Sequence, residues 1–163
     1  MNIKEILLKN KNKGILIDTG TIYSSDCILD KVADHLKSGV KIIQFYVKNF
    51  TDKQNIETAF KLRQLCSIFD ALLIINSRVD IAQLVKADGI CLFDDDMSIF
   101  QAKELLHDDL IIGINTNKLQ NALEAQQNNA DYISIEPCAY SSLKDNIKAL
   151  NRIKVIELDR QII

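Results

Sequence analysis

The sequence contains a single proline, only five glycines and no stretch rich in either, so it offers no candidate interdomain linker. Its 163 residues suit one domain with a sizeable hydrophobic core. A GxGxxG motif, which is typical of dinucleotide-binding folds, is missing after the first apolar run, where the sequence reads DTGTIYSS. These absences favour one domain over residues 1–163 and argue against a dinucleotide-binding fold.

Other absences narrow the class of protein. The four cysteines form no CxxC pair and have no histidine at metal-ligand spacing. We therefore expect reduced thiols and no zinc site. No apolar stretch approaches the roughly 20 residues that span a bilayer, and the first residues are too polar for a signal peptide. The net charge is -2, without a Lys/Arg cluster. We therefore expect a cytoplasmic protein with no nucleic-acid or membrane partner.

Short apolar runs rich in β-branched residues alternate along the chain with longer amphipathic stretches. The runs are nearly continuous in Ile, Leu and Val, as expected for parallel strands that are buried on both faces. They predict strands over residues 14–18, 41–47, 71–76, 89–93, 110–115, 132–137 and 154–158.

The stretches between these runs have helical periodicity. Ile56, Leu62 and Phe69, for example, lie on one apolar stripe. Gly39 is predicted to end the first helix, because glycine is favoured just after a helix C-terminus. Further helices are predicted over residues 52–70, 78–86, 98–106 and 117–129.

Strand–helix units that repeat every ~20–30 residues predict a parallel α/β fold, and we favour a TIM-barrel-like (βα) barrel over an open doubly wound sheet. A complete barrel has eight such units, whereas the sequence offers about seven strands. The predicted barrel is therefore incomplete, with the last βα unit missing. Its first and last strands would have unpaired edges, so we expect a homodimer that covers the open side. Alternatively, residues 159–163 (DRQII) fold back over the gap.

Five short motifs follow or overlap the predicted strands. They are QFYVK (44–48), INSRVDIA (75–82), ADGICLFDDD (87–96), IIGINTN (111–117) and ADYISIEPCAYSSLK (130–144). In this order they resemble the motifs QLRxK, INDRVDIA, ADGVHLGQxD, IIGxSxH and ADYIGxGPxFPTxTK of the thiamine phosphate synthase family and its sister group, the thiazole tautomerases. The resemblance implies one thiamine phosphate synthase-like (βα)-barrel domain over residues 1–163.

The resemblance also implies a reaction. In the family, an aminopyrimidine diphosphate loses pyrophosphate, and a thiazole phosphate captures the carbon. A phosphorylated small molecule is therefore the implied partner and Mg²⁺ the implied cofactor, because proteins bind Mg²⁺ through one or two carboxylates together with substrate phosphate. The implied site residues are Lys48 and Lys144 as catalytic groups that hold the diphosphate with Gln44, Asn76 at the pyrimidine end, Asn115 and Ser141 as further substrate-binding residues, and Asp96 as the metal ligand.

Four departures from the family motifs bear on catalysis. Ser77 stands where a metal-binding aspartate is expected, and Tyr46 replaces a diphosphate-binding arginine, which is not a conservative change. Asn117 replaces the histidine of the tautomerases. Beyond Gly113 the sequence has no glycine, so the turns that hold the thiazole phosphate are not represented.

Several of these residues also have purely structural interpretations. Arg78 and Asp80 are predicted to pair with each other or to cap the following helix. Asp94, Asp95 and Asp96 can instead cap the helix that starts near Ser98, because acidic side chains stabilise helix N-termini. Lys48 and Lys144 can equally be surface lysines.

Three functions are consistent with the pattern. The first is a diverged thiamine phosphate synthase-like protein of thiamine biosynthesis whose catalysis is impaired or lost. The second is a non-catalytic descendant that binds a phosphate or diphosphate ligand or serves as an assembly subunit. The third, thiazole tautomerase, is disfavoured by Asn117.

Overall fold

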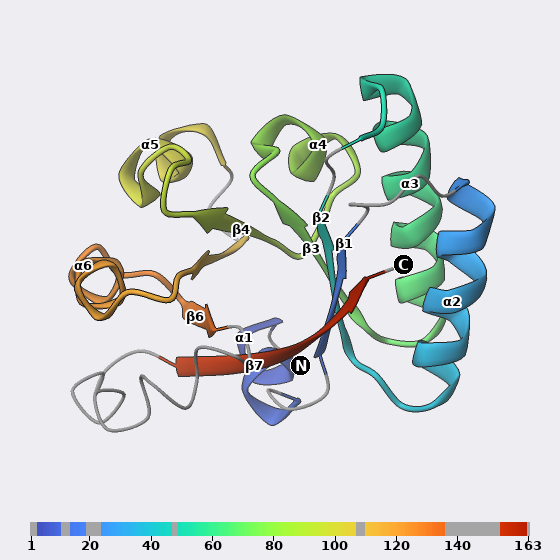
Figure 1. Ribbon diagram of the computed structural model, residues 1–163, viewed down its shortest axis with the longest axis horizontal. Helices are drawn as coiled ribbons and strands as arrows, with labels where there is room; N and C mark the ends of the chain where they lie inside the picture. Colours follow the sequence, from blue (N-terminus) through green and yellow to red (C-terminus); the bar gives the residue numbers. More distant parts are fainter. Residues whose placement is uncertain are drawn as a thin grey trace.

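The computed structural model describes residues 3–10, 14–18, 24–46, 49–106, 110–135 and 154–162. Strands lie at the centre and helices surround them (Figure 1). The strands are β1 (Gly14–Asp18), β2 (Ile42–Tyr46), β3 (Leu72–Asn76), β4 (Gly89–Phe93), β5 (Ile111–Asn115), β6 (Tyr132–Ile135) and β7 (Lys154–Ile162). The helices are α1 (Ile3–Lys9), α2 (Ser25–Lys37), α3 (Asp52–Ile68), α4 (Val79–Leu84), α5 (Ile99–Leu105) and α6 (Leu119–Gln127).

All pairings between neighbouring strands are parallel, and the spatial order from β1 to β7 follows the sequence. A doubly wound sheet reverses its strand order at a switch point, and no such reversal occurs here. The prediction of a parallel α/β, TIM-barrel-like fold is confirmed. Gly39 follows α2 with a φ of 99°, a conformation that favours glycine, and so ends that helix as predicted.

Strand β7 closes the sheet. Residues 154–157 pair with β6, and residues 158–162 pair with β1. The prediction that the first and last strands have unpaired edges is therefore wrong, and the homodimer inferred from those edges loses that support. Residues 159–162 instead pair within the chain, as in the alternative of a tail that folds back over the gap.

Side chains of β2 to β6 alternate between the barrel interior and the surrounding helices. On β2, for example, Ile43 and Phe45 pack in the outer layer, whereas Ile42 belongs to the interior cluster. The outward-facing strand residues are apolar, and the interior near the amino ends of the strands is mainly apolar too. Buried polar side chains occupy the interior only further along the strands. This division places the candidate site at the carboxyl ends of the strands.

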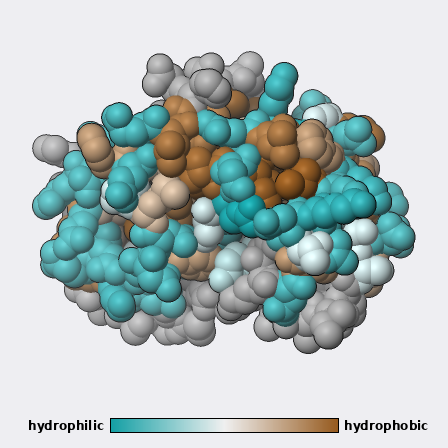
Figure 2. Space-filling view, turned by 90° about the horizontal axis from the view of Figure 1, so that it is seen from above, coloured by the Kyte–Doolittle hydropathy of each residue, from teal (hydrophilic) through white to brown (hydrophobic). Residues whose placement is uncertain are grey.

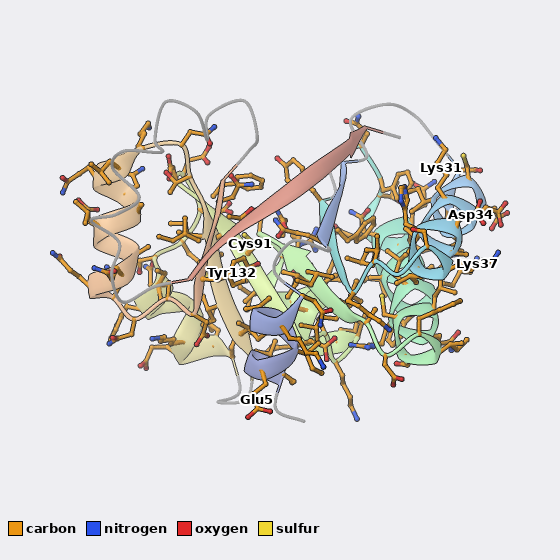
Figure 3. The ribbon with its side chains drawn as sticks, turned by 90° about the horizontal axis from the view of Figure 1, so that it is seen from below. Glu5, Lys31, Asp34, Lys37, Cys91 and Tyr132 are labelled. Atoms are coloured by element: carbon orange, nitrogen blue, oxygen red, sulfur yellow. The ribbon has the colours of Figure 1, made fainter. Side chains whose placement is uncertain are left out.

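Helix α1, which was not predicted, closes the opposite end of the interior. Its Leu7 is 1% exposed and packs with the first residues of two strands, Leu72 and Ile111. In Figure 3, α1 lies at the foot of the strands, near the labelled Glu5, and the arrowhead of β7 points away from it. The described helices include none that is both long and apolar enough to cross a membrane.

Two aspartates that precede strands fix neighbouring strands against one another. The Asp88 carboxylate accepts a hydrogen bond from the Leu73 N–H over 2.8 Å, and Asp131 accepts one from the Ile112 N–H over 2.9 Å. Asp88 also forms a largely buried ion pair with Arg63 on α3. These contacts connect the sheet to the helical layer at the end remote from the candidate site.

Candidate functional site

The last inward-facing positions of the strands are polar or aromatic. Asn76 ends β3, Asn115 ends β5, and Ser134 lies near the end of β6; all are buried. Gln44 lies one layer deeper on β2 and is also buried. In parallel α/β proteins the carboxyl ends of the strands carry the site, because the loops that follow them can vary without disturbing the core. We call this end of the interior, with the loops after β3, β4 and β5, the mouth.

Several amide groups at the mouth lack a hydrogen-bond partner among the described residues. They are Gln44 Nε2, both side-chain polar atoms of Asn76, and Asn115 Nδ2. A buried polar atom without a partner costs about 1–3 kcal/mol, so native proteins rarely tolerate several close to one another. Unpartnered donors and an unpartnered acceptor at the mouth are therefore suited to a polar ligand.

Tyr132 and Cys91 form the floor beneath these amides, and Figure 3 shows them side by side in the interior. The Tyr132 hydroxyl donates a hydrogen bond to Gln44 Oε1 over 3.4 Å. Burial raises the pKa of the Cys91 thiol to about 12 and that of the Tyr132 hydroxyl well above its usual value. Both groups are neutral near pH 7, so neither serves as a nucleophile or a general base there. Cys91 is completely buried and packs with the apolar side chains of the interior.

The loops after β3 and β4 meet at Ser77 and Asp96. The Ser77 hydroxyl donates a hydrogen bond to Asp96 Oδ2 over 2.6 Å, and the Phe93 N–H donates to the same oxygen over 2.7 Å. Ser77 has a φ of 62°, a left-handed conformation that is uncommon for residues other than Gly, Asn and Asp. Asp96 is thus held in place by one donor from the neighbouring loop, Ser77, and by one from the end of its own strand, Phe93.

This arrangement does not fit Mg²⁺. Neighbouring oxygens on an octahedral Mg²⁺ lie about 2.9 Å apart, with the ion about 2.1 Å from each. The Ser77 and Asp96 oxygens are closer, at 2.6 Å, because a hydrogen bond joins them directly. Within the described ranges, moreover, no three His, Cys, Asp or Glu side chains are grouped so that they could hold a metal ion. The assignment of Asp96 as a metal ligand stays a prediction from the family resemblance.

An aromatic pair occupies the side of the mouth next to β2. The rings of Tyr46 and Phe93 lie 4.8 Å apart, centre to centre, at an angle of 56°. Tyr46 replaces the arginine of the family motif, and Phe93 stands where that motif has a glycine. A cationic position has therefore become part of an apolar contact.

A pocket of about 280 Å³ opens between the loops after β4 and β5. It is lined by Phe93, Asp94, Asp95, Asn115, Thr116, Asn117 and Lys118. The Lys118 ammonium lies 3.6 Å from the Asp94 carboxylate, so this lysine is already paired with an acid. Asn115, predicted to bind substrate, therefore faces a space large enough for a small ligand.

The structural interpretation of Arg78 is confirmed. Its guanidinium donates to both carboxylate oxygens of Asp80, over 2.9 and 2.6 Å, and to Asp52 on α3 over 2.8 Å. The hydrogen bonding from Arg78 is the main cause that holds the pKa of Asp80 below its usual value. The capping role suggested for the acids before α5 is wrong, because Ser98 caps that helix in a reciprocal arrangement with Gln101.

The remaining predicted site residues, Lys48, Ser141 and Lys144, lie outside the described residues. Sequence reasoning missed Phe93, Thr116 and Ser134, which the structure adds to the mouth. The period of two along a strand could have found Phe93 and Ser134, because each lies two positions beyond an inward-facing residue. Thr116 follows the end of β5 and had no comparable signal.

Comparison with known proteins shows extensive similarity. Residues 15–162 match the family model described as thiamine monophosphate synthase. The thiamine-phosphate synthase of Synechococcus sp. (strain CC9311) is 38% identical over 133 residues, which cover 82% of this chain and 38% of the relative. That of Fusobacterium nucleatum subsp. nucleatum is 40% identical over 119 residues, covering 73% and 58%. The chain thus spans less than two thirds of the length of these two relatives.

A comparison with solved structures also finds a protein of thiamine phosphate metabolism. The thiamine phosphate pyrophosphorylase from Pyrococcus furiosus superimposes with a TM-score of 0.79 at 32% identity, over 93% of this chain and 77% of that one. A putative dihydrodipicolinate synthetase from Pseudomonas aeruginosa, 10% identical, matches with a TM-score of 0.62 over 88% of this chain and 63% of the other. At that low identity the second match concerns the fold alone.

Proposed function

Because this chain belongs to the thiamine monophosphate synthase family, we propose that it is a thiamine phosphate synthase-like protein of thiamine biosynthesis whose coupling reaction is impaired or lost. The observation that carries the proposal is the set of buried amides at the mouth. They offer hydrogen bonds to a polar ligand at the carboxyl ends of the strands, where the family motifs place the substrate. Two charged residues expected nearby are replaced, by Ser77 and Tyr46. Ligand recognition is thereby retained and catalysis weakened.

The proposed division of labour follows the resemblance. Lys48 and Lys144 hold a diphosphate together with Gln44. Asn76 faces the pyrimidine end, and Asn115 and Ser141 complete the substrate contacts. Loss of pyrophosphate leaves negative charge on the leaving group, which positioned cations and hydrogen-bond donors stabilise.

The described part of the mouth supplies few such cations. Its loops carry the acids Asp94, Asp95 and Asp96, whereas Lys118 already pairs with Asp94, and Arg78 pairs with Asp52 and Asp80. Tyr46 contributes an aromatic ring in place of a guanidinium. The mouth therefore favours binding of a neutral or weakly charged part of the substrate over stabilisation of a departing diphosphate.

We further propose that the barrel is a shortened, seven-stranded version of the eight-unit fold, in which β7 alone connects β6 to β1. Its nine residues are about twice the length of its neighbours, which is long enough to pair with both. A cytoplasmic location is proposed on the same family resemblance.

Calorimetric titration with pyrophosphate, in the presence and absence of Mg²⁺, tests ligand binding. We expect weak, saturable heat, and we expect Gln44→Ala to lower the affinity about fivefold or more, since Gln44 is assigned to the diphosphate and one hydrogen bond contributes about 1 kcal/mol. Asn128→Ala is the matched control, because Asn128 is exposed at the far end of α6. A folded protein that gives no heat up to millimolar pyrophosphate contradicts the proposal.

A second candidate function, an assembly subunit, is supported by apolar side chains on the surface. Leu84 on α4 and Leu105 on α5 are 52% and 56% exposed, and a hydrogen bond from Gln83 to the Leu105 carbonyl joins the ends of these helices. Hydrophobic side chains reach the surface between hydrophilic ones on the face that carries α4 and α5 (Figure 2). Clustered exposed apolar groups mark association sites. The homodimer is therefore proposed through this face and not through a strand edge.

Light scattering in line with size exclusion tests the homodimer. We expect a dimer at tens of micromolar and a monomer for the double variant Leu84→Lys/Leu105→Lys, because two buried charges without partners oppose association. Ile68→Lys is the control, since Ile68 is 75% exposed on α3 and its replacement leaves the α4–α5 face intact. A wild-type monomer at this concentration rules the homodimer out.

A further inference from the structure

The contact between Ser77 and Asp96 carries an inference about the metal. Both residues follow strands at the mouth, and the family resemblance assigns metal-binding carboxylates to both positions. Here one of the two is a serine, and its hydroxyl donates directly to the remaining carboxylate over 2.6 Å. That distance is typical of a hydrogen bond between a hydroxyl and an ionised carboxylate.

We propose that this hydrogen bond has replaced a divalent metal ion, so that the mouth of this protein binds its ligand without Mg²⁺. Asp96 Oδ2 accepts from Ser77 and from the Phe93 N–H, and an ion bound to that oxygen would have to displace at least one of these donors. The neutral serine hydroxyl offsets less of the free energy of removing water from the ion than a carboxylate would. Mg²⁺ gives up water reluctantly and binds carboxylates in preference to hydroxyls.

Two further observations point to a ligand at this position. Asn76, the neighbour of Ser77, is 1% exposed, and neither of its side-chain polar atoms has a partner among the described residues. An amide offers both a donor and an acceptor, so it can recognise a polar ligand directly. Asn115 Nδ2 is likewise buried and unpartnered within the described mouth. A metal-free site can therefore bind its ligand through amides.

The backbone at position 77 makes the inference testable by a single substitution. With a φ of 62°, this residue favours Asp or Asn over Ser, so both replacements suit the main chain. Ser77→Asp places a second carboxylate beside Asp96 and restores a pair of anionic ligands. Ser77→Asn has nearly the same shape without the charge and serves as the matched control.

Thermal unfolding with Mg²⁺ or Mn²⁺ as the only added probe gives the first readout. We expect the melting temperature of Ser77→Asp to rise by about 3–6 °C at metal concentrations about tenfold above the dissociation constant. Wild type and Ser77→Asn are expected to show no saturable shift. Adding Asp96→Asn to Ser77→Asp is expected to abolish the response, which would assign it to this pair of carboxylates.

Electron paramagnetic resonance of Mn²⁺ with the wild-type protein gives a second readout, which does not depend on the folding of Ser77→Asp. We expect no bound Mn²⁺ at millimolar concentration. Saturable binding by wild type that is lost in Asp96→Asn overturns the proposal, and so does a folded Ser77→Asp variant without a metal response. Neither measurement involves substrate or pyrophosphate, so their outcome is independent of the proposed function.

Discussion

Thiamine phosphate formation by the purified chain is expected to be undetectable, or orders of magnitude slower than in a complete family member. Two oriented charges are missing: Ser77 replaces a carboxylate, and Tyr46 replaces a guanidinium. Each oriented group that stabilises a developing charge is typically responsible for about a hundredfold or more in rate. Tyr46 packs against Phe93, so its ring is committed to an apolar contact.

The measurement is turnover with both substrates, beside a complete thiamine-phosphate synthase assayed under the same conditions. The double variant Tyr46→Arg/Ser77→Asp is expected to raise the rate in the presence of Mg²⁺. Tyr46→Gln/Ser77→Asn changes the same positions without adding charge and is expected to stay at the wild-type level. Wild-type turnover of about 1 per second or faster, an ordinary enzyme rate, would show that these substitutions do not impair catalysis.

Replacing Gly113 with alanine is expected to destabilise the barrel by about 3 kcal/mol, near the upper end for overpacking a core. A Cβ atom at this position would lie 2.2 Å from two ring atoms of Tyr132, far inside van der Waals contact. Tyr132 is fully buried, so a movement of its ring would disturb the side chains packed around it. The inward position on β5 must therefore lack a side chain for the tyrosine on β6 to fill the interior.

Chemical denaturation of a small set of variants distinguishes this clash from a backbone effect. Gly113→Ala/Tyr132→Leu is expected to lose less unfolding free energy than the two single changes added together, because the shorter side chain at position 132 relieves the contact. Gly39→Ala is the comparison, since nothing lies within 4 Å of its Cβ position and only its φ of 99° opposes the change. It should cost about 1 kcal/mol. If Gly113→Ala is as stable as wild type, the packing of Tyr132 on Gly113 is refuted.

Much of the fold could be predicted because the signals were local. Runs of Ile, Leu and Val identified the strands, and helical periodicity identified α3 to α6. Helix α1 was missed because it has only seven residues in a polar segment and depends on Leu7, which becomes buried only when the barrel has formed. The closure was missed for a related reason: residues 159–162 read as a polar tail, and only pairing with β1 extends β7 to Ile162.

The site was predictable where it depends on position within a strand, and not where it depends on loops. Gln44, Asn76 and Asn115 could be selected because they lie at or near the carboxyl ends of predicted strands. The hydrogen bond between Ser77 and Asp96 joins two loops that are 19 residues apart in the sequence. No local pattern predicts such a contact, because it requires the parallel alignment of β3 and β4.

Closure by β7 also bears on the time course of folding during translation. Gly14 on β1 pairs with Leu158 on β7, the last of the described strands. One edge of β1 therefore stays without its neighbour until β7 has left the ribosome. Contacts between residues so far apart form slowly, because a long loop must close before any stabilisation is gained. Until then one edge of β1 can pair with other nascent chains. Protection by a chaperone would therefore matter most in the interval before residues 158–162 emerge.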